Sequence, residues 1–130
     1  MLETFSTETI EAIFDTLPVD LTFVDDTDTV RYYSRGDQRI FKRSPAVIGK
    51  QVKDCHPQKS LHKVEQVVSD LKSGRRDVAE FWIDLQGRKI YIRYFAVRDK
   101  AGKYLGTLEV TQDITDLQKI EGEKRLLDEG

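Results

Sequence analysis

Residues 78–114, with the sequence VAEFWIDLQGRKIYIRYFAVRDKAGKYLGTLEVTQDI, decide the fold of this chain. β-Branched and aromatic residues are concentrated in three runs within this stretch. The runs are residues 78–85, 89–98 and 104–114. Turns that contain glycine, at 86–87 and 99–102, separate them. This spacing predicts a three-stranded antiparallel meander.

The second turn sets the expected register of the last two strands. With this turn centred on Ala101, the opposed pairs are Ile92 with Val110, Tyr94 with Leu108, and Arg93 with Glu109. The first two pairs then share one face of the sheet, and the unlike charges of Arg93 and Glu109 face each other on the opposite side. Such a cross-strand pair contributes under about 1 kcal/mol to stability, so we assign it no chemistry.

A helix and a hairpin are predicted at the N-terminal end. Apolar residues at helical spacing in 6–17 indicate an amphipathic helix that Ser6 could cap. Pro18 would end this helix, because proline disfavours helical backbone in the preceding residue. Alternating apolar residues in 19–23 and the extended pattern of 30–33 predict a two-stranded hairpin.

Further helices are predicted between the hairpin and the meander and at the C-terminal end. Short apolar pairs among turn residues in 36–49 favour short helical turns. Residues 57–73 place apolar side chains on one helix face and stop before Gly74, which predicts the longest helix. Residues 116–127 have a narrow apolar seam that predicts a terminal helix suited to a partner helix, although Gly122 weakens it by about 1 kcal/mol.

Composition and charge exclude several classes of protein. The chain has 130 residues, 38% of them hydrophobic and 34% charged, as expected of one globular domain. A formal net charge of -2 gives no field to hold a polyanion, so no nucleic-acid partner is expected. The positive residues of 39–43 and 75–76 are interpreted as solvated faces.

Membrane association and secretion are not expected either. No run approaches the roughly 18 apolar residues of a membrane span, and the first residues lack the basic start and apolar stretch of a signal peptide. A single cysteine, Cys55, excludes an internal disulfide and fits a reducing compartment. We therefore expect a cytoplasmic protein.

Several motifs, in order along the chain, resemble those of PAS domains over roughly residues 10–118. Val47-Ile48-Gly49-Lys50 and His56-Pro57 resemble the segment that leads into the long central helix of that family. Tyr104-Leu105-Gly106 and Gln112-Asp113-Ile114-Thr115 resemble its last strand and its Asp-Ile-Thr ending. The segments 55–57, 79–82 and 117–127 are most like bacterial PAS domains attached to hemerythrin-like domains. Whether the chain is a whole protein or an excised domain stays open.

The resemblance implies an α+β fold with a five-stranded antiparallel sheet and flanking helices around a central pocket. It divides the chain into an N-terminal amphipathic helix in 1–17, a PAS core in 18–115 and a C-terminal helix or tail in 116–130. It also implies a sensory or regulatory module that catalyses nothing and acts in signal transduction. A hemerythrin-like or other effector domain is a possible partner.

The expected ligand-binding residues surround the space between the sheet and the long helix. They are Phe23, Tyr32, Phe41, Cys55, His56, Val64, Val68, Phe81, Ile92, Tyr94 and Leu108. Buried hydroxyls at Tyr32 and Tyr94 would need partners, which favours a small, mostly apolar ligand held by one or two polar contacts. The same residues also describe an ordinary filled core, so a structural dimerisation domain without a ligand is the alternative function.

Cys55 and His56 form the most noticeable reactive pair, because a thiol and an imidazole can ligate a metal or support nucleophilic catalysis. Adjacent residues rarely point at one centre, and the chain has one cysteine and two histidines, too few for a usual zinc site. No orienting third group is evident, so we predict no metal and no catalytic residue.

Haem and flavin are the cofactors that the resemblance raises. Haem-binding PAS domains carry an axial histidine on the long helix, where this chain has His62. The helical wheel, however, places His62 away from the apolar stripe and toward solvent. A flavin adduct needs an Asn-Cys-Arg-Phe type of motif, and residues 54–57, Asp-Cys-His-Pro, differ from it. The cofactor is therefore left open, with haem at His62 as the minor alternative.

The opposite face of the sheet is expected to be covered. By the parity above it carries Trp82, Tyr91, Phe95 and Val97. An uncovered aromatic face of that size favours association, so we predict a homodimer through the N-terminal helix and this face.

Overall fold

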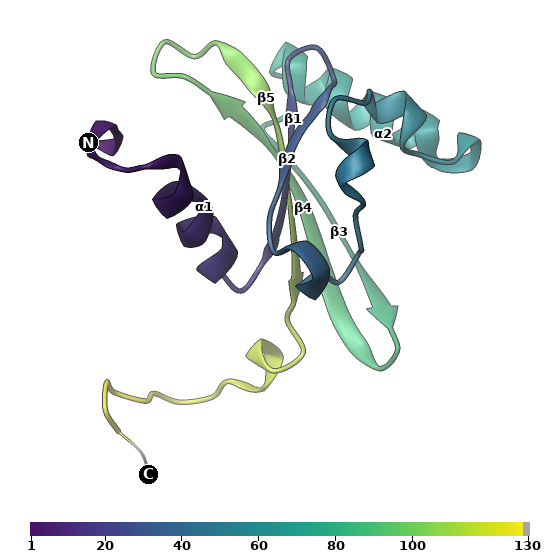
Figure 1. The fold of residues 1–130 in the computed structure, drawn as a ribbon. Coiled ribbons are helices and arrows are strands. Elements are labelled where there is room, and N and C mark those ends of the chain that lie inside the picture. The colour runs from purple at the N-terminus through teal and green to yellow at the C-terminus, as the bar shows by residue number, and fades with distance from the viewer. Residues whose placement is uncertain (129–130) are drawn as a thin grey trace.

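Five antiparallel strands form one sheet in the order β2-β1-β5-β4-β3 (Figure 1). This computed structural model describes residues 1–128, with Asp37 described by its backbone alone. The strands are β1 (Asp20–Asp25), β2 (Val30–Tyr33), β3 (Val78–Leu85), β4 (Arg88–Arg98) and β5 (Tyr104–Asp113). Helix α1 (Thr7–Thr16) lies on one side of the sheet, which we call the outer face. Helix α2 (Gln58–Ser73) lies on the other side, the inner face, so the predicted α+β architecture is confirmed.

The ends of both helices follow from local chemistry. The Ser6 hydroxyl accepts the Thr9 backbone N–H at 3.0 Å and so caps α1, which ends at Leu17 before the proline. Helix α2 follows Pro57 and ends at Gly74, whose φ of 81° is costly for any residue with a Cβ. Between β2 and α2 the chain makes the expected short helical turns, at Gly36–Gln38, Pro45–Val47 and Val52–Asp54.

A β-bulge corrects the predicted register of β4 and β5. Arg98 pairs with Tyr104, as the turn centred on Ala101 requires, but Val97 pairs with Gly106. One extra residue in β5 therefore shifts every later pair by one position. The observed pairs are Ile92 with Thr111, Arg93 with Val110, Tyr94 with Glu109 and Phe95 with Leu108.

The shift exchanges the two faces of β5 and of its neighbour β1, because side chains alternate along a strand. Strand β1 pairs Thr22 with Glu109 and Phe23 with Leu108. Glu109 and Thr22 therefore lie on the inner face with Tyr94, whereas Phe23 and Leu108 lie on the outer face. The predicted parity of β3 and β4 holds, since Trp82 pairs with Tyr91 and Phe81 with Ile92.

The C-terminal segment departs from the prediction. Only Leu117–Lys119 form a 3₁₀ turn, and residues 120–128 are not helical. Gly122 adopts a φ of 61°, and Ile120 and Leu127 are largely exposed. An isolated short helix is marginal in water, so a seam without a packing partner does not hold one. Residues 129 and 130 of the predicted tail lie outside the described residues.

Arg39 is buried, with 5% of its surface exposed, and is not the solvated residue that the charge pattern predicted. Its Nη1 donates to the backbone oxygens of Leu21 and Ser34, both at 2.9 Å. Its Nη2 donates to the Thr22 hydroxyl at 3.0 Å, and its Nε donates to the Phe41 oxygen at 3.0 Å. One guanidinium thus joins β1, the end of β2 and the segment that follows.

Gly106 marks the closest approach of two strands. A Cβ at this position would lie 2.6 Å from the Phe23 ring and even closer to the backbone oxygen of Val24. The backbone of β1 cannot yield as a side chain can, so glycine is required here for space rather than for a special φ. Among residues 1–128, no helix is both long and apolar enough to span a membrane.

We predict that Arg39→Lys lowers the free energy of unfolding by about 3 kcal/mol, because one ammonium cannot replace four divergent guanidinium bonds to buried acceptors. Urea titration followed by circular dichroism measures the change. The control is the exposed Arg31→Lys, expected to stay within about 0.5 kcal/mol of the parent. Equal effects of the two substitutions would contradict the clamp described for Arg39.

We predict that Gly106→Ala destabilises the fold by about 3 kcal/mol through overlap with β1. The comparison is Gly87→Ala in the β3–β4 turn, where a Cβ meets no atom within 4 Å but the φ of 77° remains strained. That substitution should cost only about 1 kcal/mol. Thermal unfolding of both variants ranks them, and a smaller effect at Gly106 would refute the close approach.

Candidate functional site

A small cavity of about 50 Å³ lies between the inner face of the sheet and the segments that cover it. Side chains from four strands, the turns after β2 and helix α2 line it. They are Thr22, Val24, Val30, Arg43, Val47, Val52, Cys55, His56, Val64, Val68, Tyr94, Thr107 and Glu109. The walls are mainly apolar, with a few polar groups on the sheet side and at Arg43.

An ion pair forms the polar part of this cavity. Arg43 Nη2 lies 3.2 Å from Glu109 Oε1, and both side chains are more than three-quarters buried. Glu109 comes from the middle of β5, where the bulge turns it inward, and Arg43 comes from the segment before the Pro45–Val47 turn. The Nε of Arg43 is buried without a hydrogen-bond partner in the structure, so this guanidinium has a donor to spare.

Tyr94 completes the polar cluster. Tyr94 lies directly opposite Glu109 of β5, and both side chains line the cavity. Burial, and then the negative charge of Glu109, raise the pKa of Tyr94 well above its usual range. Tyr94 therefore stays protonated at physiological pH, beside the carboxylate of Glu109.

Cys55 and His56 line the cavity at the end of the Val52–Asp54 turn. The Nδ1 of His56 lies 2.9 Å from the backbone oxygen of Val52. Because a carbonyl can only accept, Nδ1 carries the proton of this bond. Within residues 1–128, no cluster of three or more His, Cys, Asp or Glu side chains could hold a metal ion.

The structure brings five of the predicted ligand-binding residues to the cavity and places six elsewhere. Cys55, His56, Val64, Val68 and Tyr94 line it. Phe23, Tyr32 and Leu108 lie on the outer face, where the Tyr32 ring is 5.7 Å from that of Phe14 in α1.

The other three predicted residues do not line the cavity. Ile92 is fully packed in the core on the inner face. Phe81 shares that face and stacks on Tyr94 at 6.3 Å, but it lies on the edge strand and is 45% exposed. Phe41 is half-buried and contributes its backbone oxygen to the Arg39 clamp.

The sequence argument missed the polar residues of the cavity. The register predicted from sequence places Glu109 on the face opposite Tyr94, and the charge pattern predicts a solvated Arg43. Gly106 could have indicated these residues. A glycine inside a strand is typical of a β-bulge, and a bulge moves every later side chain of the strand to the opposite face. Parity then turns Glu109, flanked by Leu108 and Val110, toward the interior, where a cation is required.

The residues present do not fit a haem. His62 is exposed on α2 and does not line the cavity. A cavity of about 50 Å³ holds only a few water molecules, far less than a porphyrin.

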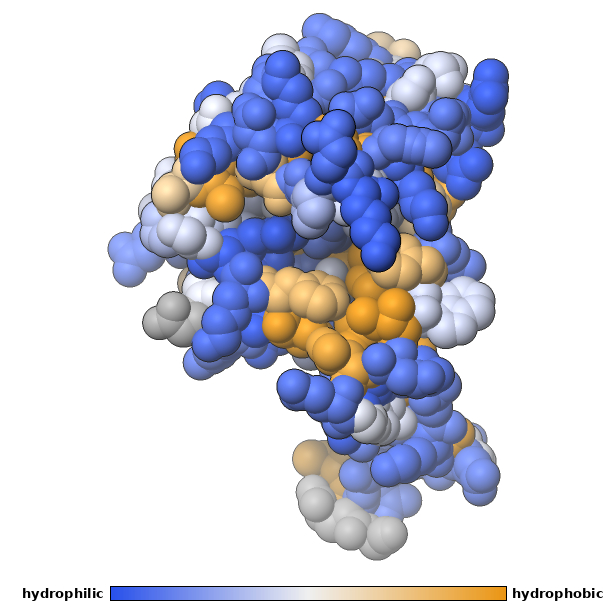
Figure 2. Space-filling view, turned by 90° about the vertical axis from the view of Figure 1, so that its right-hand side faces the viewer, coloured by the Kyte–Doolittle hydropathy of each residue, from blue (hydrophilic) through white to orange (hydrophobic). Residues whose placement is uncertain are grey.

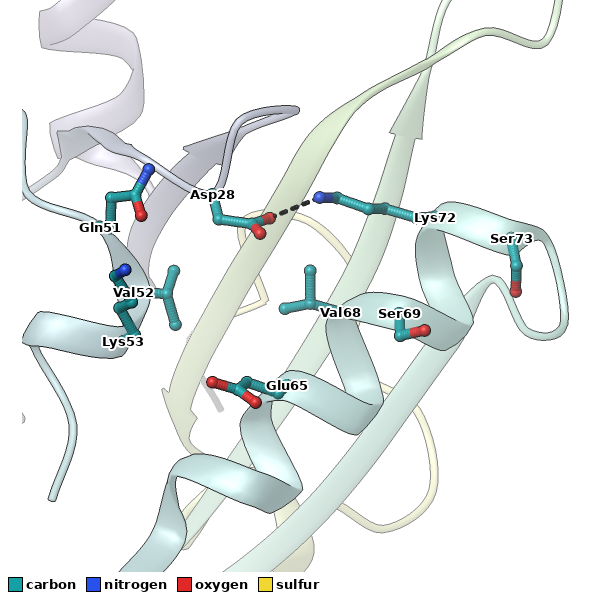
Figure 3. Close-up of a pocket in the computed structure, with 9 residues that line it drawn as sticks. All are labelled: Asp28, Gln51, Val52, Lys53, Glu65, Val68, Ser69, Lys72 and Ser73. Carbon is teal, nitrogen blue, oxygen red and sulfur yellow. Dashed lines mark ion pairs between the residues drawn. The ribbon is translucent and has the colours of Figure 1, made fainter. Parts of the chain in front are cut away.

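A second, larger hollow lies outside the cavity, between α2 and the β1–β2 turn (Figure 3). We call this hollow the outer groove because it lies outside the cavity, although it is on the α2 side of the sheet. It has a volume of about 560 Å³. It is lined by Asp28, Gln51, Val52, Lys53, Glu65, Val68, Ser69, Lys72 and Ser73. Asp28 and Lys72 form an ion pair of 2.9 Å across the groove.

Apolar surface is exposed on both faces of the sheet. Viewed from the side that carries α2, the surface is mostly hydrophilic with one compact apolar patch (Figure 2). Phe81 and Ile83 of β3 are exposed on this inner face. On the outer face Trp82 is 61% exposed, and Ile13 and Leu17 of α1 are also uncovered.

Comparison with known proteins agrees with this architecture. The sequence profile of the family described as "PAS domain" matches residues 10–115. The C-terminal domain of a protein from Streptococcus mutans is 37% identical, with a TM-score of 0.85, over 90% of this chain and 91% of that one. No curated protein sequence matches the chain.

Two more distant structures share the fold. A sensory box sensor histidine kinase from Vibrio cholerae is 11% identical, with a TM-score of 0.57, over 83% of this chain and 91% of that one. VqmA of Vibrio cholerae is 20% identical, with a TM-score of 0.59, over 86% of this chain and 59% of that one. With the profile match over most of its length, the chain belongs to the PAS domain family.

Proposed function

We propose that this PAS domain is a non-catalytic sensory module that binds a small neutral molecule with a hydrogen-bond donor beside an acceptor. The observation that carries the proposal is the cluster of Arg43, Glu109 and Tyr94 on the wall of the interior cavity. Amides, ureas and lactams have this chemistry. A cytoplasmic location belongs to the proposal, in keeping with the lone cysteine.

The cluster offers a matched set of partners to such a ligand. The carboxylate of Glu109 can accept an N–H, and the spare Nε of Arg43 can donate to a carbonyl. A neutral ligand leaves the ion pair balanced, whereas a charged ligand would add an uncompensated charge to a buried site. The valines of the opposite wall favour a flat or apolar body.

The cavity must widen to hold any organic molecule, since it has a volume of only about 50 Å³. We propose that widening is the signal, because a ligand that binds the wide state better shifts the population toward it. A related fold has been seen with a ligand, since the VqmA structure is of that protein bound to DPO. At 20% identity this supports the fold as a ligand carrier and says nothing of the ligand here.

A chain of hydrogen bonds can transmit the change to α1. Thr22 lines the cavity and accepts from Arg39, which also donates to the oxygen of Ser34. The next residue, Arg35, donates its backbone N–H to Asp15 of α1 at 2.8 Å. Movement of the cavity wall would therefore reach α1 through directly bonded groups. A hemerythrin-like or other effector domain is a suitable recipient.

The second candidate function is dimerisation, favoured by the uncovered apolar side chains of the outer face. Ile13 and Leu17 of α1 and Trp82 of β3 face solvent in the single chain. We propose that a second copy covers them, with α1 of each protomer against the outer face of the other. In a two-fold arrangement, the same apolar surface is buried on both protomers.

We predict that donor–acceptor fragments bind the wild-type chain and that Glu109→Gln weakens them at least about tenfold, since a charged hydrogen bond is lost. Ligand-observed NMR on matched sets of neutral amides and lactams, with ketones and esters as the sets without a donor, measures this. Arg43→Met should act in the same way.

The control for ligand binding is the exposed Glu8→Gln in α1, which should bind as the parent does. Native mass spectrometry of freshly purified protein adds a direct search for a bound small molecule. The proposal is refuted if amides and lactams give no more hits than ketones and esters, or if the hits persist in Glu109→Gln.

We predict that Trp82→Glu and Ile13→Glu each weaken self-association at least about tenfold, because they place a charge in an apolar contact. Sedimentation velocity over a concentration series gives the dissociation constant. Ile48→Glu is the matched control, since Ile48 and Ile13 are both 45% exposed but Ile48 lies next to the Pro45–Val47 turn. A wild-type chain that remains monomeric at every soluble concentration would remove the dimer.

A further inference from the structure

The outer groove and the interior cavity share a wall. Among the described residues, Val52 and Val68 alone line both hollows. In the close-up of the groove, their side chains point toward each other from opposite sides (Figure 3). Val52 comes from the turn after the Gln51 bridge to Thr29, and Val68 comes from the middle of α2.

On the sheet side, no comparable passage into the cavity exists. Strands β1, β2, β4 and β5 form that wall, and their backbones are joined by continuous antiparallel pairing. On the side facing the groove, the wall includes the side chains of Val52 and Val68. A hollow of about 560 Å³ and one of about 50 Å³ therefore have these two valines in common.

We propose that Val52 and Val68 form a gate through which small molecules pass from the outer groove into the cavity, and that its width selects flat or narrow ligands. The inference rests on the proposed small-molecule function and adds a route and a selecting pair to it. β-Branched valine has few side-chain rotamers, so the gate opens mainly when the two backbones separate.

The two sides of the gate are held with different strength. Val52 is 6% exposed and donates its backbone N–H to the oxygen of Asp28 at 2.9 Å. Helix α2, by contrast, buries only Asp70 and Leu71, both near its C-terminal end. Val68 is only partly buried, so the α2 side of the gate yields more easily than the Val52 side.

The Asp28–Lys72 ion pair links the two sides above the gate. Asp28 holds Val52 through its backbone oxygen and holds α2 through its carboxylate. Both charged side chains are more than one-third exposed. The ion pair therefore stabilises the closed gate only weakly. Moving this part of α2 away from the β1–β2 turn stretches the contact.

Cys55 provides a built-in reporter of the gate, because it lines the cavity beyond the two valines. The probe is iodoacetamide, a small neutral amide. Cys55 should be alkylated about fivefold faster in Val68→Ala than in wild type, and faster also in Lys72→Gln. The reason is that local opening governs access to a half-buried thiol. Mass spectrometry follows the reaction, in which the thiolate displaces iodide from carbon.

The matched control is Val67→Ala, which removes the same two methyl groups from α2 at a position that lines neither hollow. Each rate is compared with that of the urea-unfolded chain and with the measured stability of the variant, so that global unfolding is accounted for. Equal rates for Val68→Ala and Val67→Ala would overturn the gate.

The bulkier Val68→Leu gives the opposite test. It should slow the labelling by iodoacetamide and slow it further for N-ethylmaleimide, which has a larger cross-section. Unchanged rates with both reagents would also overturn the gate. The outcome is independent of the ligand proposal: loss of fragment binding with gated labelling intact refutes the ligand class alone, whereas fragment binding with ungated labelling refutes the gate alone.

Discussion

The extra residue in β5 between its pairings with Arg98 and Val97 is the constraint on which the interior depends. Because strand side chains alternate, this one residue determines that Glu109 and Thr107 face α2 while Leu108 and Val110 face α1. Strand β1 is paired to β5 and inherits the same assignment. Without the bulge the inner face would be a continuous apolar core. With it, a carboxylate lies inside the domain, and the Arg43 guanidinium is positioned to neutralise it.

Polar groups inside the domain have two separate uses. Arg39 is saturated by four acceptors and serves the fold, because it satisfies backbone oxygens where the β1–β2 hairpin ends. Arg43 is only partly saturated and has a free donor beside the cavity. Arg39 and Arg43 are close in sequence and carry the same charge. Arg39 stabilises the fold, whereas Arg43 has a spare donor at the cavity. In the proposed function, such a polar wall would favour discrimination between ligands over tight binding, since each new hydrogen bond replaces one to water.

The limits of the sequence argument are local and physical. Ser6, Gly74 and the two turns of the meander set element boundaries by chemistry within a few residues, so they could be predicted. The bulge could not be placed by pattern alone, because apolar alternation on β5 fits either face until Gly106 is considered. Burial of Arg39 depends in part on acceptors contributed by residues 21 and 22, which are 18 and 17 positions away in sequence. The terminal helix failed because propensity without a packing partner does not hold a short helix.

Helix α1 is held to the rest of the domain by few contacts, so little free energy is needed to move it. It buries none of its residues and is held mainly by the Phe14 contact with Tyr32 and by the bond from Arg35 to Asp15. An arm held by so few contacts costs little free energy to displace. A weakly held helix moves in response to small changes elsewhere in the domain, but it also moves without them. In the proposed sensory function, this weak attachment would let a small change in the cavity reposition α1, and contact with a second protomer or an effector would favour one position.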